Sequence, residues 1–203
     1  IDNYDSFTHN LVQMFMHYDL EINVFRSDKI SIEQIEFLNP DYILISPGPK
    51  DPENAGISVS VVKTFAGKIP IFGVCLGMQA LMDESEENNG TAALGIIPGR
   101  VLHFSTKLVN TGDEPRLKIP HMGWNHVHQT KTHKLWQDVP QDSRFYFVHG
   151  YYVEPDSEEV VMATTPYGKD FVSAISCENI FAVQFHPEKS QHAGLTFLSN
   201  FLH

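Results

Sequence analysis

Apolar residues in the first 80 positions follow two spacings, one typical of helices and one typical of strands. Helical spacing predicts amphipathic helices at residues 6–18, 31–38 and 58–65. A first strand is predicted at residues 22–25. Short apolar runs at residues 42–45 and 70–74 predict two more, of the kind that is buried on both faces of a sheet. A further helix is expected to begin at about Leu76. This alternation predicts a parallel sheet with helices on both faces.

After about Gly90, β-rich segments follow one another without intervening helices. They lie at residues 101–104, 127–129, 145–148, 160–164, 171–175 and 180–185, and turn signals such as Pro98-Gly99 separate them. A final helix presents Leu195, Leu198 and Leu202 on one face. We therefore expect an α/β fold in one domain, residues 1–203, with a mostly parallel central sheet and a smaller antiparallel β portion in the second half.

Composition and charge narrow the class of protein. With 42% hydrophobic and 19% charged residues, the chain has the composition of a globular protein. The net charge of −11 argues against nucleic acid as a partner, and the absence of a long apolar run argues against a membrane span. Two cysteines without a secretory leader predict a reduced, cytoplasmic protein. Ile1 and Asp2 are typical of the end of a strand, so we expect further residues before them.

Cys75 lies where the apolar run 70–74 meets the helix expected from Leu76. Gly73 and Gly77 flank it two positions away on either side. This is the pattern of a nucleophile elbow, in which small neighbours allow a sharp turn, and the helix N-terminus behind the sulfur favours the thiolate. A lone cysteine is more often a small buried apolar residue. The flanking glycines favour the nucleophile for Cys75, whereas Cys177 has no such setting.

A candidate base follows the last apolar strand. His186 comes directly after it, and Glu188 is two residues further on. If the extended conformation continues through Pro187, both side chains lie on one face, and the carboxylate can orient and stabilise the imidazolium. The alternative is a surface histidine at a strand end. A metal site at His126 and His128 is disfavoured, because no further ligand follows at a typical spacing.

Acyl transfer also requires donors for the oxyanion. The backbone N–H of Leu76, the residue after the nucleophile, is one candidate. Gly48, in the segment 46–49 after another parallel strand, is the second, because the carboxyl ends of such strands bind ligands. The alternative for this Pro-Gly pair is an ordinary turn.

Three segments, residues 46–49, 73–79 and 184–188, together resemble the class I glutamine amidotransferases. The resemblance covers essentially the whole chain and implies the same sheet with helices on both faces. It implies that Cys75, His186 and Glu188 form a catalytic triad, with Gly48 and Leu76 as oxyanion donors. It also implies a set of residues that hold the substrate glutamine: Gln79, Glu87, Gly150 and Tyr151.

Two branches of the family share this resemblance. Residues 1–80 resemble the glutaminase subunit of anthranilate synthase and 4-amino-4-deoxychorismate synthase, through the runs 1–8 and 45–49. Residues 78–203 resemble the glutaminase subunit of imidazole glycerol phosphate synthase, through the runs 94–101, 120–125 and 186–190. The second match is longer and richer in motifs. It favours a role in histidine biosynthesis, with chorismate amination as the alternative.

The resemblance to the histidine-type subunit implies a heterodimer in which ammonia passes to a (β/α)₈ barrel synthase. Trp124 lies in what we interpret as a polar, glycine-flanked loop, and it has the profile of an interface hot spot. A core tryptophan is the alternative. The expected interface residues are His121, Met122, Gly123, Trp124 and Asn125.

The implied reaction is hydrolysis of glutamine through a covalent thioester, which requires no metal and no organic cofactor. Two other classes of function stay open. One is a regulatory subunit that keeps the fold without turnover, and the intact triad argues against it. The other is a cysteine peptidase on the same fold, which a comparison of glutamine with peptides would separate.

Overall fold

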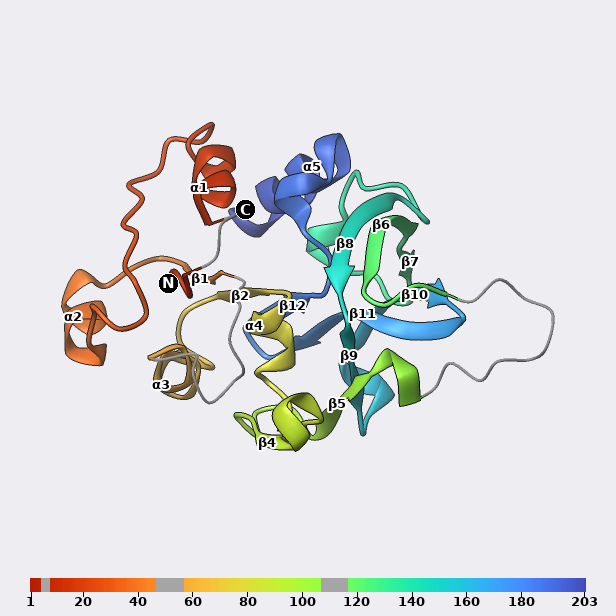
Figure 1. Cartoon of the computed structure of the whole chain (residues 1–203). Helices are drawn as coiled ribbons and strands as arrows, with labels where there is room; N and C mark the ends of the chain where they lie inside the picture. The colour runs from red at the N-terminus through yellow and green to blue at the C-terminus, as the bar shows by residue number, and fades with distance from the viewer. Residues whose placement is uncertain (5–7, 47–56, 107–116) are drawn as a thin grey trace.

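The computed structural model describes residues 1–4, 8–46, 57–106 and 117–203, and a long twisted sheet runs through its centre (Figure 1). In spatial order its strands are β1 (Ile43–Ile45), β2 (Ile71–Val74), β12 (Ile180–Val183), β11 (Lys169–Cys177), β9 (Tyr151–Pro155), β5 (Gly99–His103), β3 (Glu84–Ser85) and β4 (Thr91–Ala92). Strands β1, β2 and β12 are parallel, whereas β11 pairs antiparallel with β12. The parallel and antiparallel portions therefore meet at β12.

Further strands extend the antiparallel portion. Strand β10 (Val161–Tyr167) pairs with β11 and with β7 (His128–Gln129). Strands β6 (His121–His126) and β8 (Arg144–His149) form a separate antiparallel pair. Figure 1 shows this pair on the opposite side of the molecule from α2 and α3. Strand β8 also contacts the region after β12, through a bridge between Tyr146 and His186.

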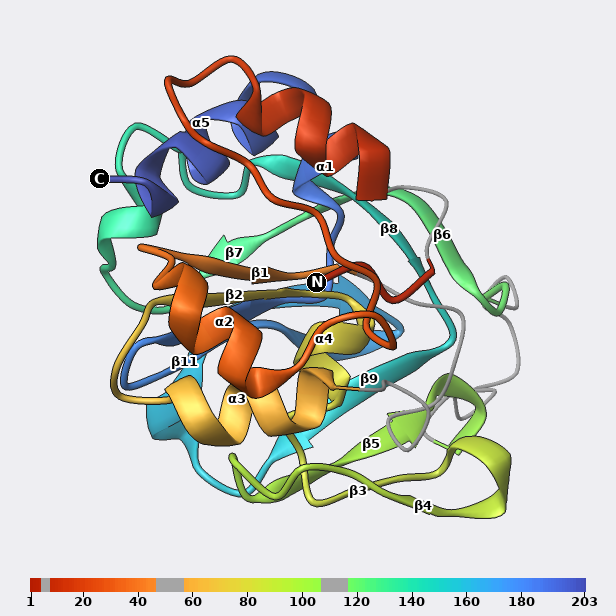
Figure 2. The same cartoon turned by 90° about the vertical axis from the view of Figure 1, so that its left-hand side faces the viewer.

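Helices cover both faces of the parallel strands. They are α1 (Thr8–Phe15), α2 (Ile32–Leu38), α3 (Ser58–Phe65), the short α4 (Leu76–Gln79) and α5 (Gln191–Phe201). Short 3₁₀ turns are η2 (Glu87–Asn89), η3 (Phe104–Thr106), η4 (Lys134–Trp136), η5 (Glu158–Val160) and η6 (Pro187–Lys189). Figure 2 shows α1 and α5 above the parallel strands and α3 below them. Among the described residues, no helix has the length and apolar character that crossing a bilayer requires.

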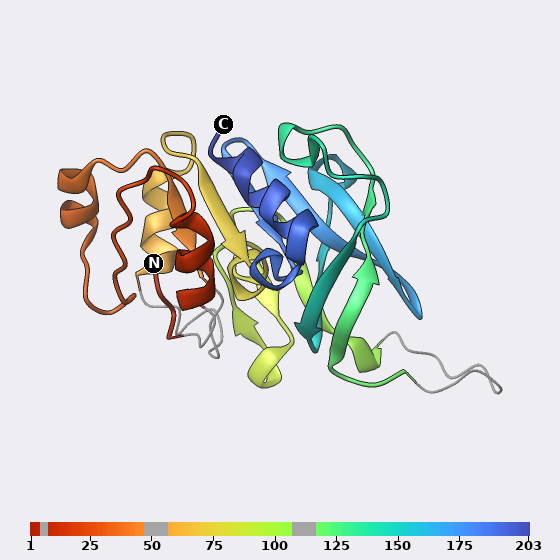
Figure 3. The same cartoon turned by 90° about the horizontal axis from the view of Figure 1, so that it is seen from above.

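The parallel strands are apolar on both faces because each face contributes to a different core. In β2, Phe72 and Val74 pack in a cluster under α5, whereas Ile71 joins a second cluster under α3. Strand β12 repeats the alternation, with Phe181 and Val183 on one side and Ile180 on the other. Figure 3 shows α5 lying along these strands, between α1 and β8. This double burial explains why the two runs are continuously apolar.

The expected fold class is confirmed, with differences at particular segments. Ser31 caps α2 through a capping box with Gln34, as expected for a helix that begins there. The strand expected at residues 22–25 is wrong, because these residues contribute no ladder and only a single bridge joins Asp2 to Arg26. Strands β6 and β9 were not predicted. Residue 6, where the first helix was expected to begin, lies outside the described residues.

Candidate active site

The chain turns sharply at Cys75, between β2 and α4. The Cys75 backbone has φ 53° and ψ −102°, a sparsely populated conformation for a residue with a side chain. Its N–H donates to the carbonyl of Val183 on β12 at 2.7 Å, which fixes the turn against the neighbouring strand. A Cβ atom on Gly73 would lie only 3.1 Å from the Gly77 carbonyl group. The two glycines therefore let strand and helix approach closely, as a nucleophile elbow requires.

Strand β12 delivers the histidine to the same edge of the sheet. Val183 pairs in register with Val74, so the parallel strands β2 and β12 end side by side. His186 follows three residues later, and its N–H donates to the Tyr146 carbonyl of β8 at 2.8 Å. A Cβ atom on Gly194 of α5 would lie 1.9 Å from the Pro187 carbonyl oxygen, so only glycine permits this approach. Strand β8 and helix α5 together hold the His186 backbone.

His186 and Glu188 form a buried pair. The Nδ1 atom of His186 lies 2.7 Å from Oε1 of Glu188, and their side chains are 3% and 0% exposed. The expected contact is present, but the expected extended backbone is wrong, because Pro187–Lys189 form the 3₁₀ turn η6. Among the described residues, the second oxygen of Glu188 has no hydrogen-bond partner. The carboxylate therefore directs its charge toward the imidazole.

The electrostatic surroundings of His186 favour the imidazolium. Burial by itself lowers the pKa of His186, but the Cys75 side chain and the Glu188 carboxylate outweigh it and raise the pKa to about 10. The interaction with Cys75 also places the sulfur and the imidazole in contact. A proton can therefore be held on His186 at neutral pH and be given to a leaving group. The structure thus brings together the three side chains that the sequence predicted as a triad.

Gln184 is a buried polar residue for which we predicted no role of its own. It is 0% exposed, and its Nε2 atom donates to the Cys75 sulfur at 3.3 Å. Its Oε1 atom accepts from Gln79 Nε2 at 3.0 Å, and the same nitrogen donates to the Tyr151 carbonyl at 3.2 Å. One signal in the sequence could have indicated this role. Gln184 directly continues an apolar strand, and a buried amide there must have hydrogen-bond partners.

The other predicted residues lie around this network. Leu76 is the first residue of α4, so its N–H has no acceptor within the helix and stays available for an oxyanion. Gly48 lies outside the described residues. Gly150 and Tyr151 lie at the turn from β8 to β9. Burial, and then the Glu87 and Glu86 carboxylates, raises the pKa of the Tyr151 phenol, so Glu87 lies in the same neighbourhood.

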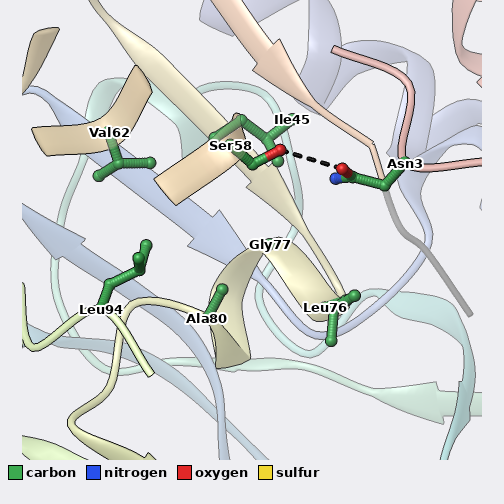
Figure 4. A pocket seen from close by; sticks show the side chains of 8 residues that line it. All are labelled: Asn3, Ile45, Ser58, Val62, Leu76, Gly77, Ala80 and Leu94. Carbon is green, nitrogen blue, oxygen red and sulfur yellow. Dashed lines mark hydrogen bonds between the residues drawn. The ribbon is translucent and has the colours of Figure 1, made fainter. Parts of the chain in front are cut away.

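A small apolar cavity lies behind the elbow. It has a volume of about 10 Å³, too little for glutamine, and Figure 4 shows its lining side chains: Asn3, Ile45, Ser58, Val62, Leu76, Gly77, Ala80 and Leu94. Buried Asn3 connects Ser46 and Ser58, because its N–H and Nδ2 donate to Ser46 and its Oδ1 accepts from Ser58. We assign this cavity a packing role.

The predicted interface residues form strand β6, so the expectation of a loop is wrong. Met122 and Trp124 are 62% and 38% exposed, which excludes a core tryptophan. The Trp124 ring packs edge-on against Tyr146 of β8, at 6.1 Å between centroids. His121 is 3% exposed and belongs to the interior instead. Gly123 and Asn125 are partly buried.

The remaining histidines and the second cysteine that the sequence singled out show no sign of a metal site or of a second nucleophile in the described part of the chain. His126 and His128 both bond to Asp142, through its carbonyl and its carboxylate respectively. In the part of the chain that the structure describes, no three His, Cys, Asp or Glu side chains are grouped as a metal site requires. Cys177 is a free thiol on β11.

The sheet, its covering helices and the cysteine elbow define the class of protein. Residues 1–203 match the family model described as glutamine amidotransferase class-I, and the chain belongs to this family. Among its relatives, the imidazole glycerol phosphate synthase subunit HisH of Nitrosomonas europaea is 51% identical over 150 residues, which cover 74% of this chain and 70% of that protein. The protein of the same name from Acinetobacter baylyi is 41% identical over 195 residues, 96% of this chain and 91% of that protein.

Solved structures show the same fold at low identity. The glutaminase domain of Trypanosoma brucei CTPS, with bound acivicin, superposes with a TM-score of 0.64 at 19% identity. The superposition covers 99% of this chain and 89% of that one. At this identity the likeness extends to the fold alone.

Proposed function

We propose that this chain is the glutaminase subunit of an imidazole glycerol phosphate synthase, and that it hydrolyses glutamine to glutamate and ammonia. The observation that carries the proposal is the sulfur of Cys75 at a strand-to-helix corner, in contact with an imidazole that a buried carboxylate supports. Membership of the glutamine amidotransferase family supports the substrate. The names of the relatives from Nitrosomonas europaea and Acinetobacter baylyi support the pathway.

The reaction follows from the charges of these groups. The Cys75 thiolate attacks the carboxamide carbon of glutamine, and the Leu76 N–H stabilises the oxyanion that forms. The carbon–nitrogen bond then breaks, and the imidazolium of His186 gives its proton to the departing ammonia. His186, now neutral, accepts a proton from water as the water attacks the thioester, and glutamate and the thiolate are released. Glu188 stabilises the imidazolium through both steps.

We further propose that the ammonia passes to a (β/α)₈ barrel synthase in a heterodimer, and that β6 faces this partner. Met122 and Trp124 support the assignment, because they are large exposed apolar side chains two residues apart, on the same face of one short strand. Trp124 packs on Tyr146, whose carbonyl accepts from the His186 N–H. A partner that contacts Trp124 on β6 would therefore be linked through Tyr146 to the backbone of His186. A cytoplasmic location rests on the free cysteines and stays a prediction.

The test is glutamine hydrolysis with and without purified synthases. We expect glutamate release in the presence of the histidine-type barrel synthase, and none from a Cys75→Ala variant. Release that responds only to anthranilate synthase or 4-amino-4-deoxychorismate synthase would favour chorismate amination. Cleavage of peptides without cleavage of glutamine would refute the proposal.

A further inference from the structure

Two buried histidines lie opposite each other at the end of the β6–β8 pair, outside the predicted triad. His121 and His149 are cross-strand partners, and they are 3% and 5% exposed. Nδ1 of His121 lies 3.0 Å from Nε2 of His149, and Nδ1 of His149 lies 2.7 Å from the Tyr151 carbonyl oxygen. Asn125 Nδ2 lies 3.3 Å from the remaining nitrogen of His121. These contacts form one continuous hydrogen-bonded chain.

Only one arrangement of protons satisfies this chain. The Tyr151 carbonyl can only accept, so Nδ1 of His149 carries a hydrogen and Nε2 of the neutral ring accepts. Nδ1 of His121 must then donate to it, and the other nitrogen of His121 accepts from Asn125. Burial supports neutral rings, because it lowers the pKa of His121 to about 4 and is the main cause that lowers the pKa of His149 to about 3.

This hydrogen-bonded chain ends at the Tyr151 carbonyl, which Gln79 also contacts. The Tyr151 carbonyl accepts from Gln79 Nε2 at 3.2 Å, and Gln79 leads through Gln184 to the Cys75 sulfur. An aromatic cluster fixes the plane of the histidine rings. Tyr167 stacks on His121 with 4.0 Å between centroids, and Phe171 lies 5.2 Å from His149. The two rings therefore have one orientation and one direction of donation, aimed at the turn from β8 to β9.

We infer that His149, with its tautomer fixed by His121, is a positioning residue that holds the Tyr151 carbonyl and thereby the Gly150–Tyr151 wall of the glutamine site. The inference rests on the proposed glutaminase function. Loss of the His149 donor leaves Gln79 as the side-chain donor to this carbonyl among the described residues, so the wall and Gln79 move together. Glutamine binding then weakens, while the chemistry at Cys75 and His186 stays the same.

Two substitutions of His149 separate the hydrogen bond from the bulk of the ring. In His149→Asn the amide nitrogen can take the place of Nδ1 and donate to Tyr151. In His149→Gln the amide reaches only the position of Nε2, so this donor is lost. In the complex with the synthase, we expect KM for glutamine to rise about tenfold in His149→Gln and to stay near wild type in His149→Asn, with kcat little changed in both. Phe171→Leu is the packing control, because it loosens the same cluster without removing a donor, and its KM should not change.

The same contrast can be made at His121 if His149→Gln does not fold. His121→Asn keeps a donor toward His149, whereas His121→Gln removes it, and only the second should raise KM. Equal KM values for both members of a pair, or a rise in KM for Phe171→Leu as large as for His149→Gln, would overturn the positioning role. Wild-type complex that does not hydrolyse glutamine would instead overturn the proposed function, so the two failures are distinguishable.

Discussion

Replacement of Gln184 by methionine tests how the protein stabilises the sulfur anion. The Gln184 side chain is fully buried and donates to the Cys75 sulfur at 3.3 Å. Methionine has a similar length and volume but no polar hydrogen, so the substitution removes the donor without opening a cavity. The Gln79 amide keeps the Tyr151 carbonyl as an acceptor, so no buried donor loses its last partner.

The magnitude follows from the charge on the acceptor. A hydrogen bond to a charged group contributes about 1.5–3 kcal/mol, and the long contact to sulfur suggests the lower end of this range. Because 1.36 kcal/mol corresponds to one pH unit, the thiolate should form about one pH unit higher in Gln184→Met. The substitution destabilises the thiolate by this amount, whereas the neutral thiol does not depend on the hydrogen bond.

The assay is the rate of alkylation by iodoacetamide as a function of pH. It is made in a Cys177→Ser background, so that Cys75 is the reacting thiol. We expect the midpoint for Gln184→Met to move upward by about one pH unit.

Ser173→Ala is the matched control for this assay. Ser173 accepts from the Gln184 N–H through its carbonyl, and its buried hydroxyl has no partner among the described residues. An unchanged midpoint in Gln184→Met, or an equal displacement in Ser173→Ala, would refute the role of the amide.

Three further predictions follow from burial and charge. Glu188→Gln removes the carboxylate from His186, so the pKa of His186 should fall below about 10 in an NMR titration, and kcat should drop on the order of 10²- to 10⁴-fold; unchanged kcat would contradict this. Thr165→Val removes a buried hydroxyl without a partner among the described residues, and calorimetry should show a gain of about 1 kcal/mol, or roughly 2–4 °C in Tm; a lower Tm would contradict it. Burial is the main cause that lowers the pKa of His149 to about 3, so the unfolded chain binds this proton more readily than the folded one. The folded protein therefore loses stability as the pH falls below 6.5. Between pH 7 and pH 5, wild type should lose about 2 kcal/mol more unfolding free energy than His149→Asn, measured with urea; equal losses would show that His149 is not responsible.

The elements that local sequence predicted best are those with a uniform environment. Strands β2 and β12 are apolar along their whole length because helices cover both faces, and this pattern can be recognised without knowledge of their partners. The turn at Cys75 can likewise be recognised from a short stretch of sequence, since it depends on the lack of a side chain at the flanking glycines. The elbow at Cys75 and its place in the fold were therefore predictable.

Strand β6 was missed because its sequence has no strand pattern. The inward side carries His121, Gly123 and Asn125 and the exposed side carries Met122 and Trp124, so the usual apolar-in, polar-out alternation is reversed. The polar residues and the glycine suggested a loop. The segment is extended because β8 pairs with all six of its residues. The contact of His186 with Glu188 was predicted for a reason that is wrong, since the turn η6 rather than an extended strand makes it.

The amino-acid sequence by itself determined the class of fold, the elbow at Cys75 and the residue types of the proposed triad, because each depends on side chains that are close together along the chain. Only the tertiary structure decided which polar groups meet. The chain from Cys75 through Gln184 and Gln79 to the Tyr151 carbonyl, and the histidine pair behind it, join segments up to 109 residues apart. No local pattern encodes such contacts, since they exist only where strands distant in sequence are brought side by side and buried polar atoms must find partners.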